Sequence, residues 1–233
     1  MISGAGAMNP VCPREDGRLE WGNGVGSMLF DTAGDSPVRL CNVAGRGMGP
    51  IGGRVTDDGR FVLERDPRPI VEVRAANTGS QDNRLTLIAT VAGSVLRFVS
   101  AAASEPEEGS AEPYRLEIVQ FASYAELEPH GRAFEPTAAE RAEAAAQPSP
   151  ETVRHADATA GLVVTSVFEA FPGLSAVRTY TRLSSARPLP IEAVSSLNLT
   201  VPMRVNCGKI DHSRVFWGDS AWAVENDWRS RPL

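Results

Sequence analysis

The chain has 233 residues, 42% of them hydrophobic, and a formal net charge of −6 at pH 7. This is enough apolar material for one large domain or two small ones. Binding to nucleic acid or to an anionic membrane surface needs clustered positive charge, so the acidic balance argues against both partners. Three cysteines without a C-x-x-C spacing favour a reducing compartment over a disulfide framework.

The sequence contains no recognisable secretory or membrane-spanning segment. Its first residues lack the basic start and the apolar stretch of a signal peptide. The longest apolar runs, such as residues 161–164, are far shorter than the ~20 residues that a membrane helix needs. We therefore predict a cytoplasmic protein.

Residues 1–53 are rich in glycine and turn-forming residues, with dense clusters at 21–26 and 45–53. A nucleotide-binding loop needs a strand before the glycines and a helix after them, and the second cluster has neither. We predict tight turns and irregular edges for this segment, which we place in the same domain as the rest of the chain.

Residues 54–233 show the alternating apolar runs and intervening turns that are typical of a β-sandwich. Apolar residues alternate with others over 61–63, 70–74 and 85–91, and again over 114–121, as half-buried antiparallel strands require. Turn-forming residues separate these runs, which is typical of a sandwich. The predicted fold class is all-β, in antiparallel sheets.

One short helix is expected to interrupt the strands. Thr137 and Glu140 form a capping box, and the alanine-rich residues 142–146 have high helix propensity until Pro148 stops them. The apolar face of this helix is mostly alanine. Because it has little to bury, we place it on the surface, as an insertion between strands.

The last part of the chain has the most regular pattern. Residues 162–168 alternate, residues 171–173 (Phe-Pro-Gly) turn, and residues 177–183 alternate again. A proline-rich loop then leads to a third alternating run at 191–201. We predict that the second and third runs pair as antiparallel neighbours.

Catalytic and metal-binding patterns are weak. Residues 211–213 (Asp-His-Ser) contain the residue types of a hydrolase triad, but neighbours on an extended chain point in alternate directions and cannot form that relay. We interpret them as a polar turn. The three histidines and three cysteines are scattered without ligand spacing, so we expect neither a metal nor another cofactor.

Tryptophans gather near the C-terminal end, with Trp217, Trp222 and Trp228 within twelve positions. Flat apolar rings stack on sugars, and nearby carboxylates bind sugar hydroxyls. This makes Trp222, Glu225 and Trp228 the candidate substrate-binding residues. The alternative is that these rings close one end of a sandwich, which Trp217 favours because it follows the apolar pair Val215 and Phe216.

The order of motifs from residue 168 to 233 resembles the N-terminal domain of α-galactosidases of glycoside hydrolase family 36. The motifs are a Phe-Pro-Gly turn at 171–173, R-x-Y-x-R-L at 178–183 and a proline-bounded strand at 190–197. W-x-x-E at 222–225 and Arg-Pro-Leu at 231–233 complete the pattern. The likeness covers a little over a quarter of the chain.

The resemblance implies an antiparallel β-supersandwich of the galactose-mutarotase-like kind, followed in the family by a (β/α)8 barrel. That barrel hydrolyses α-galactosides such as melibiose and raffinose with retention of configuration. It uses two aspartates in K-W-D and G-x-x-R-x-D settings, and neither setting occurs in this sequence. The resemblance therefore implies no catalytic residue here, no activity of the chain alone, and a sandwich incomplete at its C-terminal end.

The family resemblance also suggests what the chain contributes. The expected role is assembly and substrate access, with a catalytic barrel, further copies of the chain and, through the parent enzyme, an α-galactosyl oligosaccharide as partners. An incomplete sandwich would leave an unpaired strand edge that favours association. Two alternatives remain open: a free-standing carbohydrate-binding module that uses Trp222 and Trp228, and a structural β-protein without a sugar role.

Overall fold

The computed structural model describes residues 9–11, 16–33, 36–45, 53–55, 61–63, 67–75, 90–127, 156–199, 214–221 and 224–232. The chain divides into two compact units, Met1–Thr200 and Val201–Leu233. Strands dominate, and every strand pair described is antiparallel, so the predicted all-β antiparallel class is confirmed.

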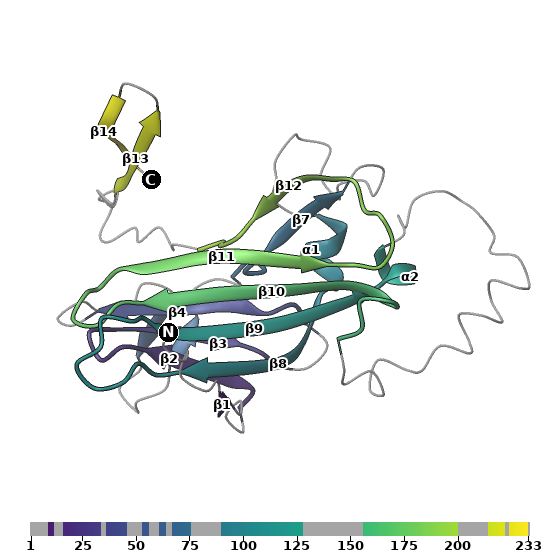
Figure 1. Cartoon of the computed structure of the whole chain (residues 1–233), viewed down its shortest axis with the longest axis horizontal. Coiled ribbons are helices and arrows are strands. Elements are labelled where there is room, and N and C mark those ends of the chain that lie inside the picture. The colour runs from purple at the N-terminus through teal and green to yellow at the C-terminus, as the bar shows by residue number, and fades with distance from the viewer. Residues whose placement is uncertain are drawn as a thin grey trace, which may run out of the picture. The chain divides into compact units, whose positions relative to one another are not determined.

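A five-stranded sheet forms one layer of the first unit (Figure 1). Its order is β1 (Asn9–Pro10), β8 (Arg97–Ser104), β9 (Tyr114–Ser123), β10 (Gly161–Ala170) and β11 (Val177–Ser184). The alternation in the sequence predicted the three long strands β9, β10 and β11. The Phe-Pro-Gly turn connects β10 to β11, and Gly173 has φ of 71°, a left-handed conformation that glycine adopts without strain.

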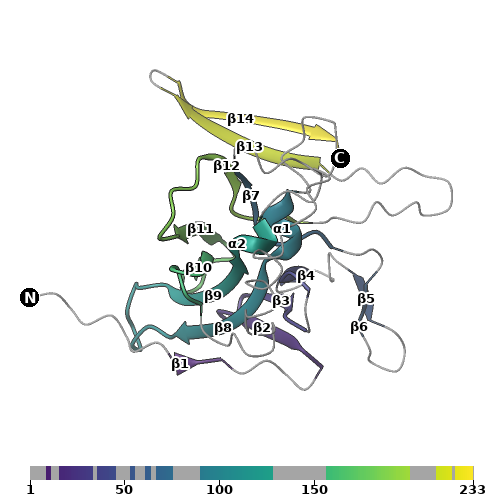
Figure 2. The ribbon, with the colours of Figure 1, turned by 90° about the vertical axis from the view of Figure 1, so that its right-hand side faces the viewer.

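The opposing layer contains a meander of β2 (Arg18–Gly22), β3 (Gly26–Asp31) and β4 (Arg39–Gly45). Trp21 of β2 and Phe30 of β3 pack on Phe168 of β10, with ring centroids 6.3 and 5.0 Å away, so the two layers meet there. Figure 2 shows the ribbons of these strands from the side. The first 53 residues therefore contain regular strands, where we expected irregular edges. The glycines at 22–26 do form a turn, between β2 and β3.

Two short strand pairs also belong to the described part of the first unit. β5 (Gly53–Val55) pairs with β6 (Phe61–Leu63), and β7 (Glu72–Ala75) pairs with β12 (Ile191–Ser195). The core includes fully buried side chains from both layers, among them Phe30, Leu40, Leu116, Ile118 and Phe168. This burial is the main source of stability for a sandwich of this kind.

The predicted pairing of the last two alternating runs is wrong, because β12 pairs with β7 and β11 pairs with β10. The proline-rich loop after β11 carries the chain to β7, with which β12 forms a separate two-stranded sheet. There Glu192 of β12 makes a 2.8 Å ion pair with Arg74 of β7. Alternation shows that a segment is a strand, but it does not encode which distant strand lies beside it.

The helices also differ from expectation. Val91, which we assigned to a strand, begins the short helix α1 (Val91–Val95), and α2 (Tyr124–Leu127) follows β9. Thr90 caps α1 by accepting a hydrogen bond from the Gly93 N–H, and this local cap outweighs the apolar alternation before it. The helix predicted around Thr137 lies outside the described residues.

In the second unit, the described residues 214–221 and 224–232 form a hairpin. β13 (Arg214–Ala221) pairs with β14 (Val224–Pro232), with a register shift between Asp219 and Ala221. The predicted polar turn at 211–213 lies outside the described residues. Across the part of the chain that the structure describes, no helix is long and apolar enough to cross a membrane.

Candidate functional site

The sequence-predicted sugar-binding residues fall on the second unit. Trp222 lies outside the described residues. Glu225 and Trp228 lie on β14, with Trp228 opposite Gly218 of β13, and Trp217 is opposite Arg229 in the same hairpin. The structure describes the backbone of this hairpin at those positions, so their role in binding sugars stays a prediction.

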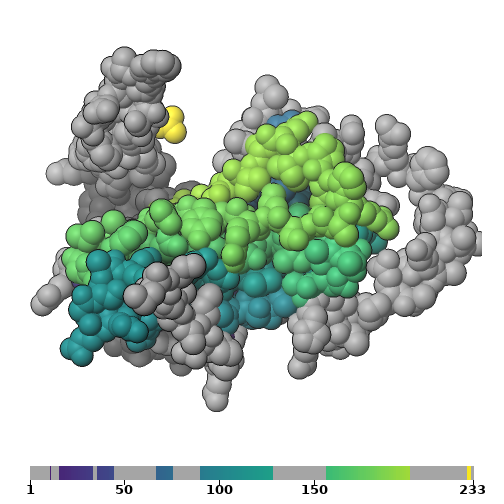
Figure 3. All heavy atoms as spheres, viewed as in Figure 1, coloured from purple at the N-terminus to yellow at the C-terminus, as the bar shows by residue number. Residues whose placement is uncertain are grey.

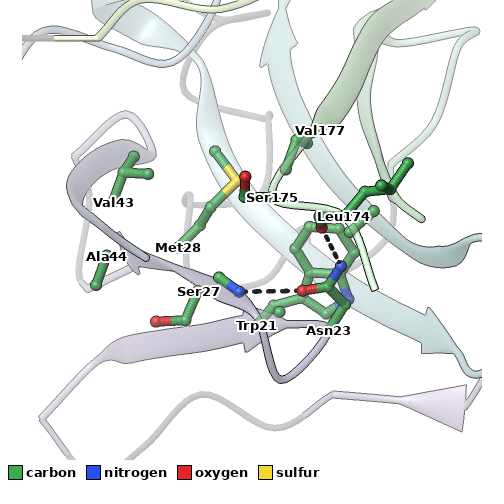
Figure 4. A pocket seen from close by; sticks show the side chains of 12 residues that line it. Trp21, Asn23, Ser27, Met28, Val43, Ala44, Leu174, Ser175 and Val177 are labelled. Carbon is green, nitrogen blue, oxygen red and sulfur yellow. Dashed lines mark hydrogen bonds between the residues drawn. The ribbon is translucent and has the colours of Figure 1, made fainter. Parts of the chain in front are cut away.

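A pocket of about 210 Å³ lies in the first unit, between the β2–β3 turn and the segment that leads into β11 (Figure 4). Its lining is mostly apolar and includes Trp21, Met28, Val43, Leu174 and Val177. The last two residues are about half exposed, at 56% and 42%, and form part of the rim. The Phe-Pro-Gly turn of the family resemblance therefore lies next to the pocket.

Trp21 contributes little open ring surface to this pocket. Its side chain is only 8% exposed, because it packs against Phe168 with an interplanar angle of 55°. A sugar stacks on an aromatic ring when a whole face is open to it. Trp21 is thus mainly a core residue whose remaining surface forms one wall of the pocket.

Asn23 connects the β2–β3 turn to the turn between β10 and β11, and it has no hydrogen-bonding capacity left for a ligand. Its side-chain N–H groups donate to the carbonyl oxygens of Phe171 (2.6 Å) and Leu174 (2.8 Å). Its side-chain oxygen accepts from the N–H groups of Val25 and Gly26, both at 3.1 Å. Figure 4 draws the bond from Gly26 and the bond to Leu174. These four bonds use both donors and both acceptor positions of the amide.

The pocket therefore suits a small apolar group. Ser27 and Ser175 are the lining residues with side-chain hydroxyls, beside the saturated Asn23. Small-molecule sites usually have volumes of ~300–1,000 Å³ and several convergent polar groups. A volume of about 210 Å³ accommodates one ring or one apolar side chain.

A second feature is an arginine–glutamate lattice on the outer face of the five-stranded sheet, the face turned away from β2, β3 and β4. Arg115 donates to Glu117 at 2.6 Å and lies 3.9 Å from Glu169. Arg178 pairs with Glu169 and Arg182 with Glu117, each at 2.6 Å. Figure 3 shows this face, with atoms of β9, β10 and β11 toward the viewer.

Paired carboxylates can perform glycoside hydrolysis, so the two glutamates of the lattice are candidates for a catalytic acid and base. Glu169 and Glu117 are only 6% and 17% exposed at their side chains, and each contacts two guanidinium groups. The Tyr180 hydroxyl also donates to Glu169 at 3.4 Å. Each carboxylate is therefore held in an ion-pair network with arginines, which favours a structural role on the sheet face over an open acid and base.

The pKa values of Cys41 and Tyr124 are shifted from their usual values. Burial, helped by the nearby Asp31 carboxylate, raises the pKa of Cys41 to about 11, which keeps this thiol protonated and unreactive. Burial opposes ionisation of the Tyr124 hydroxyl, but its hydrogen bonds with Ser185 and with backbone N–H groups outweigh burial and lower the pKa of Tyr124.

Tyr124 of α2 connects two loops at the end of the sheet where α2 follows β9. Its hydroxyl donates to the Ala158 carbonyl (3.1 Å) and accepts from the Arg187 N–H (3.0 Å). The Arg187 guanidinium lies over the ring, 4.3 Å from its centroid.

Among the described residues, no group of three or more His, Cys, Asp or Glu residues is arranged to hold a metal ion.

Comparison with known proteins finds no match for this chain among protein-family models, curated proteins or solved structures. Sequence patterns alone missed the features described above. The turn-forming character of Asn23 was visible, but its bonds to a turn 148 positions away depend on the fold. The sequence pattern predicted the strand that contains Arg178 and Arg182. It could not identify their carboxylate partners on β9 and β10, because these depend on the register between the strands.

Proposed function

We propose that the chain is a non-catalytic β-sandwich part of an α-galactosidase-like glycoside hydrolase, in which it serves assembly and substrate access. The observation that carries this proposal is the position of the resembling segment. The R-x-Y-x-R-L strand is β11, at the edge of a layered antiparallel sheet and directly after the Phe-Pro-Gly turn. An edge strand is where a neighbouring domain or subunit can continue a sheet.

The pocket supports assembly over sugar binding by the first unit. Asn23, the amide in its lining, has both donors and both acceptor positions filled, and the Trp21 ring is largely covered. Sugar recognition needs unsatisfied polar groups beside an open aromatic face. An apolar side chain from a partner needs neither, and Leu174 and Val177 extend the apolar surface at the rim.

Two measurements on the purified chain test the non-catalytic role. We expect no hydrolysis of 4-nitrophenyl α-galactoside above a buffer control, and no saturable heat on titration with galactose, melibiose or raffinose. Turnover would refute the non-catalytic assignment. Saturable binding of galactose would instead favour a carbohydrate-binding module, and replacing Trp228 by Ala would then show whether the C-terminal hairpin is responsible.

The assembly role requires a partner with the catalytic machinery. We expect the DNA downstream of this coding region to encode a (β/α)8 barrel with a K-W-D motif. Co-expressed with this chain, that barrel should co-elute with it in size-exclusion chromatography. The absence of such a coding region, or separate elution of the two proteins, would refute the proposal.

A further inference from the structure

Strand β11 is the last strand of the five-stranded sheet, and the described segment after β12 contacts it where the Thr179 hydroxyl donates to the Ser196 carbonyl at 3.4 Å. The eight residues of β11 pair with β10 along their whole length, and no second strand lies beside it among the residues that the structure describes. Most of its side chains are exposed or half-buried. An extended edge with unpaired N–H and C=O groups is a template for a further strand.

The outer face along this edge is positively charged. The side chains of Arg178 and Arg182 are 63% and 52% exposed, whereas their partners Glu169 and Glu117 lie largely buried beneath them. With Arg115, three guanidinium groups face two carboxylates in this lattice, which leaves one excess positive charge. The two β11 arginines point to the same side, four positions apart, with Tyr180 between them.

This charge pattern disfavours a second copy of the chain as the strand that pairs here. Two copies related by a two-fold axis through Tyr180 would pair antiparallel, with Arg178 of one opposite Arg182 of the other. Like charges directly opposite in neighbouring strands are destabilising. The same arginines attract a strand with carboxylates at the two matching positions.

We propose that the edge of β11 binds an extended acidic segment of a partner protein by β-strand addition. The segment carries Glu or Asp at two positions four apart, opposite Arg178 and Arg182, and a β-branched residue between them, opposite Tyr180. Backbone hydrogen bonds supply affinity and the alternate side chains supply specificity. The inference rests on the same β11 edge as the assembly role proposed above, and it adds the charge pattern of the partner strand; it uses no sugar chemistry.

A labelled model peptide, Thr-Glu-Thr-Val-Thr-Glu-Thr, tests the charge requirement by fluorescence anisotropy with the full-length chain. We expect it to bind at least about tenfold more tightly than the same peptide with Lys in place of both Glu residues. Binding should weaken with added salt because the arginines are exposed. No binding of the acidic peptide, or equal binding of both peptides, would overturn the proposal.

Two N-methylated versions of the acidic peptide test the backbone requirement. One carries methyl groups at its odd positions and the other at its even positions. In a strand, alternate N–H groups face opposite sides, so one version should retain binding and the other lose it. Equal affinity of the two versions would mean that charge alone attracts the peptide, which contradicts strand addition.

Arg182→Gln tests the site on the protein, with Arg187→Gln as the matched control. Both arginines are exposed and lie five positions apart, but Arg187 stacks on Tyr124 in the loop after β11. We expect Arg182→Gln to weaken peptide binding several-fold and Arg187→Gln to leave it unchanged. Equal effects of the two variants, or a chain dimer that Arg182→Gln does not affect, would count against the proposed edge.

Discussion

The two faces of the β9–β11 sheet each bury central side chains, but by different means. On the inner face, Phe168 is fully buried among aromatic side chains from the opposing layer. On the outer face, Val167 is equally buried, and the register places it between Tyr180 and Glu117, under the arginine–glutamate lattice. Hydrophobic packing is non-directional, whereas the lattice depends on charge and geometry, so the faces should respond differently to substitution.

The largest effect is expected on the inner face. Phe168→Ala removes a ring that contacts both Trp21 and Phe30, and the cavity should lower the free energy of unfolding by about 3–5 kcal/mol. Urea denaturation followed by tryptophan fluorescence measures this loss. Leu174→Ala, at an apolar position that is 56% exposed, is the control and should change stability by less than about 0.5 kcal/mol. Similar losses in the two variants would contradict the inner-face core.

The second largest effect is expected at the centre of the lattice. Glu169→Gln keeps the shape of the side chain but removes the charge that Arg178 and Arg115 contact. Because both arginines are partly exposed and therefore screened, we expect a loss of about 1–3 kcal/mol, smaller in 1 M salt. Glu192→Gln is the control, since its pair with Arg74 is exposed on both sides and should cost at most about 1 kcal/mol. Equal losses of unfolding free energy in the two variants would mean that the burial of Glu169 does not strengthen its ion pairs.

The sequence predicted the inner face better than the outer one. Alternation in 162–168 and 177–183 is a local property, and it identified β10, β11 and the turn between them. The partners of Arg178 and Arg182 lie on other strands, so they become visible only when the register is known. The same limit explains the wrong partner predicted for β12. The candidate sugar site stays a prediction, because Trp222 lies outside the described residues and Glu225 and Trp228 on the separate hairpin.

Cys41 lies on β4, in the layer that covers the inner face, and its burial predicts that the stability of the fold depends on pH. Its pKa is raised from 9.0 to about 11 by burial, so the folded state keeps the thiol protonated while the unfolded chain ionises. The stabilisation is complete below pH 9 and is lost as the pH rises toward 11, with about 1 kcal/mol lost by pH 10. In urea titrations between pH 8 and 10.5, Cys41→Ala should decline less steeply than the wild type. Parallel declines would mean that the thiol is not protected from ionisation.

The smallest effect compares two threonines on the inner side of β11. The Thr181 hydroxyl is buried without a hydrogen-bond partner, whereas the Thr179 hydroxyl donates to the Ser196 carbonyl at 3.4 Å. Replacing an unsatisfied buried hydroxyl by a methyl group removes a desolvation cost, so Thr181→Val should stabilise the fold by about 0.5–1 kcal/mol. Thr179→Val loses a bond and should destabilise by a similar amount. Opposite signs in paired thermal unfolding measurements are the expected result, and a loss in both variants would indicate that Thr181 is bonded after all.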